Sequence, residues 1–228
     1  MAAKVILSFK LLSKKCYNMF DIPNFLTNNF AKHEITCQLA NLSRQEQELF
    51  SQLVVQKYVN LDTNYSIGCF DNENNLVGCC LNSPYDPKVS MWNVAGTNNN
   101  VAKVLSFFND GFAKLSNTIP EENSVFDIGY LAIREDYKGK GIAKLLISLS
   151  ENVAFRSNFE FCIGLATAEA TRNIFKKRDY KLLGQQFHKD CRNSEGVQMF
   201  KEAKCVDFGS TFIKRRCYWK NKCHKIIL

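Results

Sequence analysis

The stretch from Val125 to Leu146 constrains the fold more than any other part of the chain. Val125–Ile133 is almost entirely apolar or small, and rich in branched and aromatic residues, which is typical of a strand covered on both faces. The apolar run ends there, and Gly139 and Gly141 then flank Lys140. Apolar residues next recur at helical spacing, at Ile142, Leu145, Leu146, Leu149 and Val153. The stretch therefore predicts a buried strand, a glycine turn and an amphipathic helix.

A glycine turn that leads from a strand into a helix is suited to bind phosphate. The first N–H groups of a helix lack partners, and the helix dipole adds positive charge there. Lys138, Lys140 and Lys144 favour a polyphosphate or pyrophosphate over a single carboxylate. A P-loop needs a hydroxyl residue where Gly141 stands, and a dinucleotide fingerprint needs a third glycine where Lys144 stands. Both are excluded, which leaves another phosphate loop or an ordinary turn.

The residues Asp-Tyr-Lys-Gly-Lys-Gly-Ile-Ala after a buried strand resemble the acetyl-CoA pyrophosphate loop of the GNAT superfamily of acyl-CoA N-acyltransferases. The family pattern is Gln or Arg, two residues, Gly, one residue, then Gly or Ala. Gly139 and Gly141 match it, and Asp136 departs from its first position. The resemblance implies acetyl-CoA (coenzyme A) as cofactor. The implied cofactor-binding residues are Leu131, Ala132 and Ile133 for the pantetheine amides, and Lys138, Gly139, Lys140, Gly141, Ile142 and Ala143 for the pyrophosphate.

Length, composition and charge agree with one soluble enzyme domain. The chain has 228 residues, 46% of them hydrophobic, and no Pro/Gly/Ser linker, so residues 1–228 are expected to form a single domain. The resemblance implies that this domain is an N-acetyltransferase (GNAT) domain. No apolar run approaches the roughly 18 residues of a membrane helix. The net charge of +8 suits an anionic cofactor better than nucleic acid, given where the lysines lie. We therefore expect neither a membrane nor a nucleic-acid partner, and a monomer or homodimer.

Cysteine usage indicates where the protein functions. Ten cysteines without regular spacing, in a chain that lacks a secretory signal, favour reduced thiols and a cytoplasmic protein. Met1–Lys15 has no long apolar core, although its Lys-rich and acid-free character resembles a mitochondrial presequence. Cys205, Cys217, Cys223 and His224 fit no common zinc spacing, so no metal is expected.

Periodicity and turn residues predict the remaining elements. Helices are expected over 22–30, 43–58, 101–112 and 167–177, and strands over 5–12, 65–70, 76–81, 161–166 and part of 206–218. Residues 190–204 are expected to form a loop or a variable hairpin. The order indicates an α/β protein in which the strands before and after the central helix are parallel neighbours. The resemblance further implies the GNAT fold, a mixed, mostly antiparallel central sheet with a splayed parallel strand pair flanked by helices.

Two further segments resemble the insect and nematode arylalkylamine N-acetyltransferase branch. Asn24–Phe30, followed by His33-Glu34-Ile35-Thr36, resembles that branch's F-L-x-x-x-F and E-P-L motifs, with Ile35 in place of proline. The resemblance implies that Glu34 is the general base. Thr167 and Thr171 stand where dopamine-acetylating enzymes carry two serines four residues apart.

The chemistry of amine acetylation explains these residue types. An alkylamine with a pKa of about 10 arrives protonated, so a carboxylate such as Glu34 is useful as its base. A free backbone N–H near Leu131 is expected to stabilise the oxyanion. Thr167 and Thr171, four residues apart, are expected to present two hydroxyls on one helix face, as candidates to orient the amine or to protonate the departing thiolate. Many GNAT enzymes use a tyrosine for that last step, but Phe175 occupies its position.

Each assignment has a structural alternative. Glu34 could be a solvated carboxylate at a helix end, and the two threonines could be an N-cap and a backbone-bonded helix residue. Asp127, a carboxylate in an apolar strand, could be an alternative base, although a hydrogen bond to a neighbouring hydroxyl is favoured. His188 stands alone in the sequence and indicates nothing specific.

The leading prediction is an N-acetyltransferase that acts on a small primary amine, with an arylalkylamine of the dopamine, tyramine or serotonin type first. Polyamine or protein amines are the alternative acceptors. A non-catalytic acyl-CoA-binding protein also remains open, because Ile35, Asp136, Phe175 and Asp179 depart from the family patterns.

Overall fold

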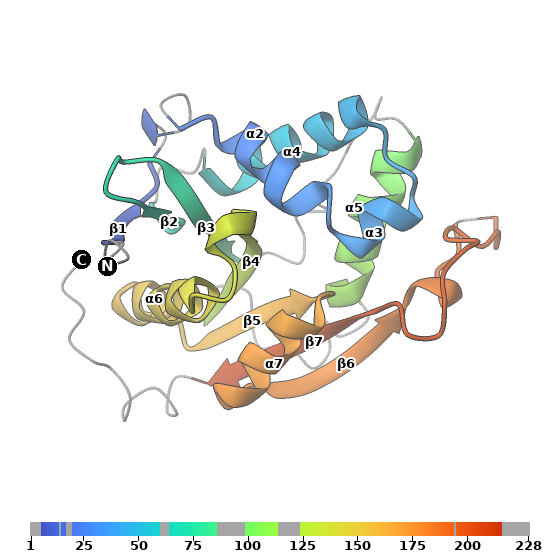
Figure 1. Cartoon of the computed structure of the whole chain (residues 1–228). Helices are drawn as coiled ribbons and strands as arrows, with labels where there is room; N and C mark the ends of the chain where they lie inside the picture. The colour runs from blue at the N-terminus through green and yellow to red at the C-terminus, as the bar shows by residue number, and fades with distance from the viewer. Residues whose placement is uncertain are drawn as a thin grey trace.

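A seven-stranded sheet with the order β1-β2-β3-β4-β5-β7-β6 runs through the molecule (Figure 1). The structure is a computed structural model and describes residues 6–13, 15–16, 20–59, 64–85, 99–113, 124–193 and 195–215. The strands are β1 (Ser8–Leu11), β2 (Ile67–Phe70), β3 (Leu76–Pro84), β4 (Val125–Ile133), β5 (Phe161–Ala166), β6 (Lys181–Phe187) and β7 (Phe208–Arg215).

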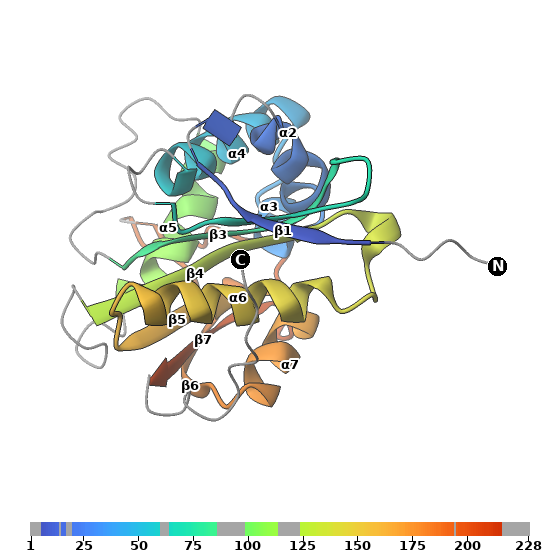
Figure 2. The same cartoon turned by 90° about the vertical axis from the view of Figure 1, so that its left-hand side faces the viewer.

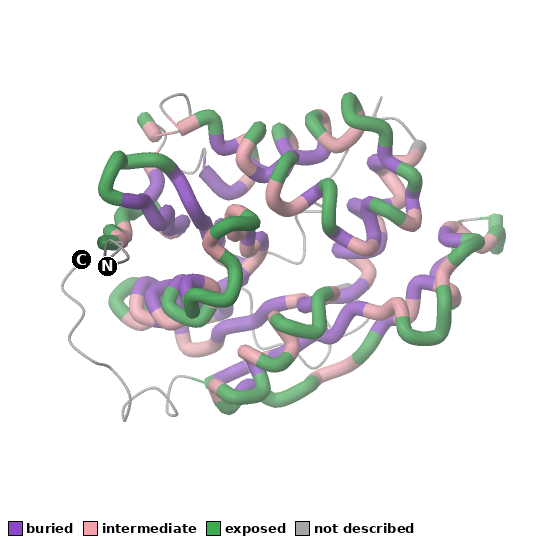
Figure 3. The backbone as a smooth tube through the Cα atoms, in the orientation of Figure 1, coloured by how far each residue is buried: buried purple, intermediate pink, exposed green. Residues whose placement is uncertain are grey.

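Helices cover both faces of this sheet. Figure 2 shows α2 (Ile22–Leu26), α3 (Ile35–Leu39), α4 (Arg44–Val59) and α5 (Asn99–Ala113) above the sheet, and α6 (Ile142–Arg156) and α7 (Glu169–Lys177) below it. Three short segments connect them: the π-helix η1 (Thr27–Ala31) and the 3₁₀ helices η4 (Glu135–Tyr137) and η5 (His188–Asp190). In Figure 3 the central strands are mostly buried and the outer sides of the helices exposed. Among the described residues, no helix is long and apolar enough to cross a membrane.

The strands β4 and β5 are the parallel pair of the sheet, and the other neighbouring strands are antiparallel. This confirms the predicted fold class. The parallel pairing joins only Val125–Asp127 to Phe161–Ile163. Beyond it, residues 128–133 of β4 have no partner on β5 in the described sheet. One edge of β4 is therefore open between the two strands, as the splayed pair of the GNAT fold requires.

A β-bulge at Gly129 interrupts β4. Ile128 and Tyr130 pair with consecutive residues of β3, so Gly129 between them has no partner in the described register. An extra residue shifts the alternation of side chains along a strand. Ile128 accordingly packs in the core under α6, whereas Tyr130 packs in the core under α4. The bulge thus makes Asp127 and Tyr130 face the same side, towards α4.

Several predicted boundaries are confirmed, because local signals set them. The capping box of α4 has both of its hydrogen bonds, with the Ser43 N–H donating to Glu46 Oε2 at 2.7 Å and the Glu46 N–H donating to Ser43 Oγ at 3.3 Å. Asp21 caps α2 through Asn24 N–H at 3.4 Å. The predicted helix over 22–30 begins as expected, but it continues beyond Leu26 as the π-helix η1.

Two expectations need correction. No strand was predicted at β6, which pairs with the later strand β7. The helix expected from Thr167 begins only at Glu169, after the N-cap Ala168. The loop or variable hairpin expected over 190–204 agrees with the described residues there, which contain an isolated antiparallel bridge between Arg192 and Gln198. Residue 5 of the predicted first strand and residues 216–218 of the predicted last strand lie outside the described residues.

Candidate active site

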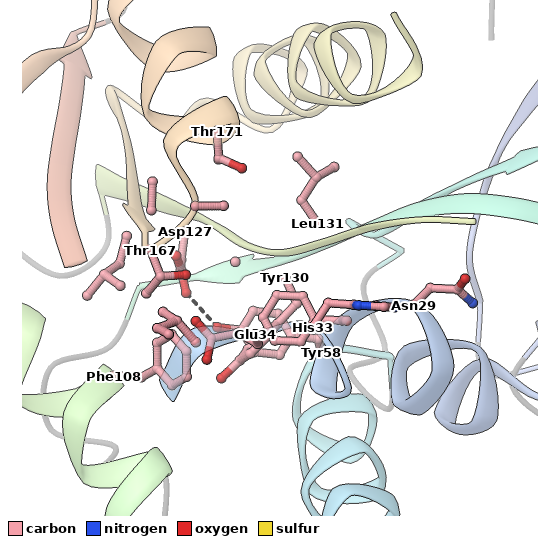
Figure 4. A pocket seen from close by; sticks show the side chains of 16 residues that line it. Asn29, His33, Glu34, Tyr58, Phe108, Asp127, Tyr130, Leu131, Thr167 and Thr171 are labelled. Carbon is pink, nitrogen blue, oxygen red and sulfur yellow. Dashed lines mark hydrogen bonds between the residues drawn. The ribbon is translucent and has the colours of Figure 1, made fainter. Parts of the chain in front are cut away.

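A cavity of about 230 Å³ lies where β4 and β5 separate (Figure 4). Its walls come from both ends of the chain: from η1, the start of α3, α4, α5, the two strands and the start of α7. The lining residues are Asn29, Phe30, His33, Glu34, Ile35, Tyr58, Phe108, Asp127, Gly129, Tyr130, Leu131, Leu165, Ala166, Thr167, Ala168 and Thr171. All three residues predicted as catalytic, Glu34, Thr167 and Thr171, line this cavity.

Glu34 is the N-cap of α3 and is buried. Its Oε2 accepts hydrogen bonds from the N–H groups of Thr36 at 2.5 Å and Cys37 at 3.0 Å. Its Oε1 has no hydrogen-bond partner among the described residues, and only 5% of Glu34 is exposed. Burial raises the pKa of Glu34, against the opposing effects of the Thr167 hydroxyl and the two N–H donors. Glu34 is therefore not a solvated helix-end carboxylate, and one of its oxygens is free to accept a proton.

Asp127 is a second buried carboxylate on the same cavity. Tyr58 donates its hydroxyl to Asp127 Oδ2 at 2.6 Å, whereas Oδ1 has no partner in the described part of the chain. Burial raises the pKa of Asp127, against the effects of the Lys57 charge and the Tyr58 hydrogen bond. The predicted hydrogen bond to a neighbouring hydroxyl is confirmed. The carboxylate nevertheless keeps one oxygen unpaired.

Aromatic rings form the apolar wall of the cavity. Four rings, from Phe30, Phe50, Tyr58 and Phe108, surround Tyr130 at centroid distances of 5.2 to 5.9 Å. The hydroxyl of Tyr130 is buried and has no hydrogen-bond partner among the described residues. The wall is therefore largely apolar, and the hydroxyls of Tyr58 and Tyr130 and the carboxylates of Glu34 and Asp127 are buried polar groups on it.

The two threonines lie at different places in the cavity. Thr167 precedes the N-cap Ala168 and belongs to the loop after β5, so the predicted pair on one helix face is wrong. The Thr167 hydroxyl lies near enough to Glu34 to act on its pKa, whereas Thr171 lies on the α7 side in Figure 4. Thr167 is also not an N-cap.

Phe175, at the position of the family's tyrosine, is part of the core. It is 1% exposed and packs against the rings of Tyr180 at 4.7 Å and Phe212 at 5.5 Å. It contributes no hydroxyl. Asp179, where the family has glycine, has a φ of 64°, a conformation that glycine adopts freely and aspartate more readily than most residues.

The loop before α6 has the geometry of an anion site. Gly139 and Gly141 have φ values of +76° and +80°, and a Cβ added to either would meet no atom within 4 Å. Gly141 is the N-cap of α6 and provides no side chain to the N–H groups of the first turn. The turn therefore leaves open space beside its glycines and no capping side chain at the positive end of a 15-residue helix, which fits a pyrophosphate.

Two lysines of this loop are held by neighbours. Lys138 pairs with Glu135 at 2.5 Å, and the Lys140 Nζ lies 4.3 Å from the centre of the Tyr137 ring. Asp136, which lies in η4 before the loop, instead forms a bidentate ion pair with Arg134. Arg134 Nε and Nη2 donate to the two carboxylate oxygens at 2.8 and 3.1 Å.

The family pattern fits the structure better when it begins at Lys138 instead of Asp136. Its glycine is then Gly141, and its last residue is Ala143 in the first turn of α6. A cationic residue then occupies the first position, although lysine replaces the glutamine or arginine. The departure at Asp136 therefore has little weight against a cofactor site.

Comparison with known proteins identifies the family. The model of the acetyltransferase (GNAT) family matches residues 30–184. The chain belongs to this family. Members of the GNAT family use acetyl-CoA, and the prediction of an N-acetyltransferase is confirmed at the level of the family.

Several solved structures share the fold of this GNAT protein. The C-terminal condensation domain of Ebony in complex with beta-alanyl-dopamine has a TM-score of 0.79 at 14% identity, covering 92% of this chain and 99% of that one. Arylalkylamine N-acetyltransferase 2 from Aedes aegypti has a TM-score of 0.73 at 21% identity, covering 92% of this chain and 98% of that one. The polyamine N-acetyltransferase of Drosophila melanogaster has a TM-score of 0.71 at 10% identity, covering 92% of this chain and 100% of that one. At these identities the likeness shows a shared fold.

Sequence reasoning missed two features near the site. Tyr58, as the partner of Asp127, had no signal beyond its place on an amphipathic helix. His188 is completely buried, stacks on Phe107 at 3.9 Å and bonds Thr36. Within the described ranges, no group of three or more His, Cys, Asp or Glu residues is placed to hold a metal ion. Cys217, Cys223 and His224 of the disfavoured zinc set lie outside those ranges.

Proposed function

We propose that this GNAT protein transfers the acetyl group of acetyl-CoA to a small primary amine, with arylalkylamines of the dopamine, tyramine or serotonin type as first candidates. One observation carries the proposal. The unpartnered Oε1 of buried Glu34 belongs to the same cavity that opens where β4 and β5 separate. A proton acceptor and a route for an acyl donor therefore meet in one place.

The residues around the open edge of β4 fit the cofactor. Leu131, Ala132 and Ile133 lie on that edge, where backbone groups can pair with the amides of a pantetheine arm as a strand would. Lys138–Ala143 would hold the pyrophosphate, since both glycines leave open space where a side chain would otherwise stand. Bound acetyl-CoA would supply the activated acetyl thioester.

Glu34 is the proposed general base. An incoming amine is protonated at neutral pH and needs a base within reach, directly or through one water. Burial raises the pKa of Glu34, which makes its carboxylate a stronger base than an exposed one. Once the amine has transferred its proton to Glu34 Oε1, its nitrogen is free to attack the acetyl thioester.

Two other groups have proposed roles. The backbone N–H at the Gly129 bulge, a residue without a register partner on β3 in the described strands, is the proposed donor for a carbonyl oxygen that gains negative charge. This moves the expected donor from Leu131 to Gly129. Thr167, beside Glu34, would orient the amine, and Thr171, on the α7 side, is the proposed proton donor to the departing thiolate.

The cavity favours a small acceptor with an apolar body. Its volume of about 230 Å³ lies below the roughly 300–1,000 Å³ of pockets for drug-sized ligands. The rings around Tyr130 suit an aryl group. The similarity to an arylalkylamine N-acetyltransferase agrees with this acceptor class.

A polyamine is the second candidate acceptor. Asp127 places a second unpartnered carboxylate oxygen on the cavity, and a second ammonium group would pair with it. The similarity to a polyamine N-acetyltransferase agrees with this candidate. The net charge of +8 opposes it by repelling polycations from the surface.

Release of free thiol from acetyl-CoA in the presence of an amine panel tests the proposal. The informative pairs are tyramine with phenethylamine, and cadaverine with pentylamine, because each pair differs only in the distal polar group. Turnover of tyramine and phenethylamine supports the first candidate, and turnover of cadaverine alone supports the second. Tight CoA binding with no turnover of these amines or of a peptide N-terminus would instead indicate a non-catalytic acyl-CoA-binding protein.

A further inference from the structure

His188 lies in η5, directly after β6, and its ring is held on two sides. The ring stacks on Phe107 of α5 with a centroid distance of 3.9 Å and an interplanar angle of 8°. Phe200 approaches it edge-on at 5.2 Å. No part of His188 is exposed. This packing fixes the plane of the imidazole, and with it the direction of both ring nitrogens.

The fixed ring connects to the candidate base through one residue. His188 Nε2 lies 2.9 Å from the Thr36 hydroxyl oxygen, a contact between residues 152 positions apart in the chain. Thr36 is the second residue of α3, and its N–H donates to Glu34 Oε2 at 2.5 Å. A chain of polar contacts therefore runs from η5 through α3 to the carboxylate.

The direction of these hydrogen bonds follows from the tautomer of His188. Burial lowers the pKa of His188 and outweighs the opposing effect of Asp207, so the ring is neutral and carries one N–H. Its Nδ1 has no hydrogen bond of acceptable geometry in the described part of the chain, although the Asp207 backbone lies near enough to act on the pKa of the ring. A buried unpaired N–H costs more than an unpaired lone pair, so we assign the proton to Nε2. His188 then donates to Thr36, which leaves the Thr36 hydroxyl proton to point elsewhere.

The Thr36 hydroxyl proton has an acceptor close by. The Thr36 side chain is among the groups that lower the pKa of Glu34 against its burial. A hydroxyl whose lone pair is occupied by His188 has its proton free for the carboxylate. The same contact anchors the first turn of α3, whose N–H groups hold Glu34 Oε2 and leave Oε1 for the cavity.

We propose that His188 is a positioning residue for Glu34, acting through Thr36 to orient the carboxylate and to favour its ionised form. The inference rests on the proposed function, in which Glu34 is the general base. It assigns a role in the acceptor site to a residue that does not line the cavity.

The other titratable groups near Glu34 and His188 decide whether a change in the titration of Glu34 can be assigned to His188. Cys37 on α3 and Tyr130 on β4 interact with Glu34, and burial raises the pKa of both well above the ordinary value, so both stay neutral. Asp127 and His33 also line the cavity. Asp207 is the charged group that acts on His188. A change in the titration of Glu34 that appears in both the His188 and the Thr36 variants is therefore attributable to the polar contacts that connect His188 through Thr36 to Glu34.

Four variants separate the hydrogen bond from packing. His188→Phe keeps a ring on Phe107 but removes the donor, and His188→Gln restores a side-chain N–H. Thr36→Val removes the hydroxyl and keeps the backbone N–H. Phe107→Leu is the packing control, because it removes the stacking partner and leaves the hydrogen-bonding groups in place. Thermal midpoints of all four report how far each change disturbs the fold.

The first readout is the pH dependence of kcat/KM with acetyl-CoA and the most active amine of the panel. His188→Phe and Thr36→Val should each lower kcat/KM about fivefold on the acidic side and move the acidic limb to higher pH, because the ionised form of Glu34 loses a donor. The KM for acetyl-CoA should not change. His188→Gln should recover to within about twofold, and the double variant should be no worse than Thr36→Val. The inference would be overturned if the acidic limb of kcat/KM stayed in place in His188→Phe and Thr36→Val and if their losses of kcat/KM only followed their thermal midpoints, as in Phe107→Leu.

The second readout does not depend on turnover. A ¹³C-carboxyl titration of Glu34 by NMR should show a higher pKa in His188→Phe and Thr36→Val than in the wild type. An inactive Glu34→Gln enzyme combined with an unchanged titration would overturn this inference alone. A fully active Glu34→Gln enzyme would overturn the general-base role of Glu34 in the proposed function, and the positioning role of His188 with it.

Discussion

The Tyr58 hydroxyl and the Asp127 carboxylate form a buried hydrogen bond of 2.6 Å between α4 and β4. It exists because the bulge at Gly129 makes Asp127 and Tyr130 face α4 together. A Cβ on Gly129 would lie 2.8 Å from the Tyr58 ring, so the bulge residue must be glycine for Tyr58 to reach the carboxylate. The Gly129 bulge, the Tyr58 ring and the Asp127 carboxylate therefore form one unit at the candidate site.

Loss of this hydrogen bond should be costly. Tyr58→Phe leaves Asp127 buried without its donor, so we expect the free energy of unfolding to fall by about 1–3 kcal/mol. Urea denaturation followed by circular dichroism measures this. The control is Tyr65→Phe, a tyrosine that packs against Phe126 and Phe159. Equal losses in both variants would contradict a special role for the Asp127 hydrogen bond.

The carboxyl of Asp127 should also make stability depend on pH. Its pKa is raised in the fold, so the folded state binds this proton more tightly than the unfolded chain. The resulting stability is present below the ordinary pKa and is lost as pH rises through the raised pKa. Asp127→Asn cannot titrate but still accepts from Tyr58. The stability of the wild type relative to this variant should therefore decrease between about pH 4 and pH 8, and a constant difference would show that the pKa is not raised.

The glycine at the start of α6 should matter for the cofactor more than for the fold. Gly141→Ala and Gly196→Ala both place a methyl group at a φ near +80° in open space, at +80° and +78°. Each should therefore lose about 1–2 kcal/mol of stability. Calorimetric titration with CoA should show about tenfold weaker binding for Gly141→Ala only, because its methyl group occupies the proposed anion site. Equal CoA affinity in the two variants would place the pyrophosphate elsewhere.

A buried ion cluster should hold α6, α7 and β7 together. Glu151 pairs with Arg178 and, at 3.2 Å, with Lys214, which is 7% exposed. Glu151→Leu leaves two cations without their carboxylate and should cost about 3–5 kcal/mol in urea denaturation.

A surface ion pair between the end of β7 and the residue before β5 is the control for Glu151. Arg215 and Glu160 lie 2.8 Å apart with side chains 61% and 44% exposed, so solvent screens their attraction. Glu160→Leu should therefore change stability by at most about 1 kcal/mol. Similar losses in the two variants would show that burial does not set the strength of the Glu151 cluster.

Local patterns predicted the part of the fold that depends on local forces. The bounds of β4 and the start of α6 at Ile142 agree with the sequence, because a doubly buried strand and a glycine turn are visible in consecutive residues. The strand β6 was missed for the opposite reason. Lys181–Phe187 is a partly exposed edge strand of the described sheet with a glycine inside it, and β7, with which it pairs there, comes later in the chain.

The candidate site could be predicted only in part. Resemblance to a family brought Glu34, Thr167 and Thr171 forward, and the structure places all three on one cavity. The bonds of Tyr58 to Asp127 and of Thr36 to His188 join residues 69 and 152 positions apart. No periodicity or motif encodes such pairs, because tertiary packing alone brings them together.

The central claim is that Glu34 accepts the proton of the amine, and the pH profile of Glu34→Gln tests it most directly. The account predicts that kcat/KM falls about 100-fold or more and that the acidic limb of the profile disappears, with the KM for acetyl-CoA little changed. Asp127→Asn, the matched control at the other buried carboxylate, should lose less than about tenfold and keep that limb. A Glu34→Gln enzyme with the wild-type rate and the wild-type acidic limb would contradict the account.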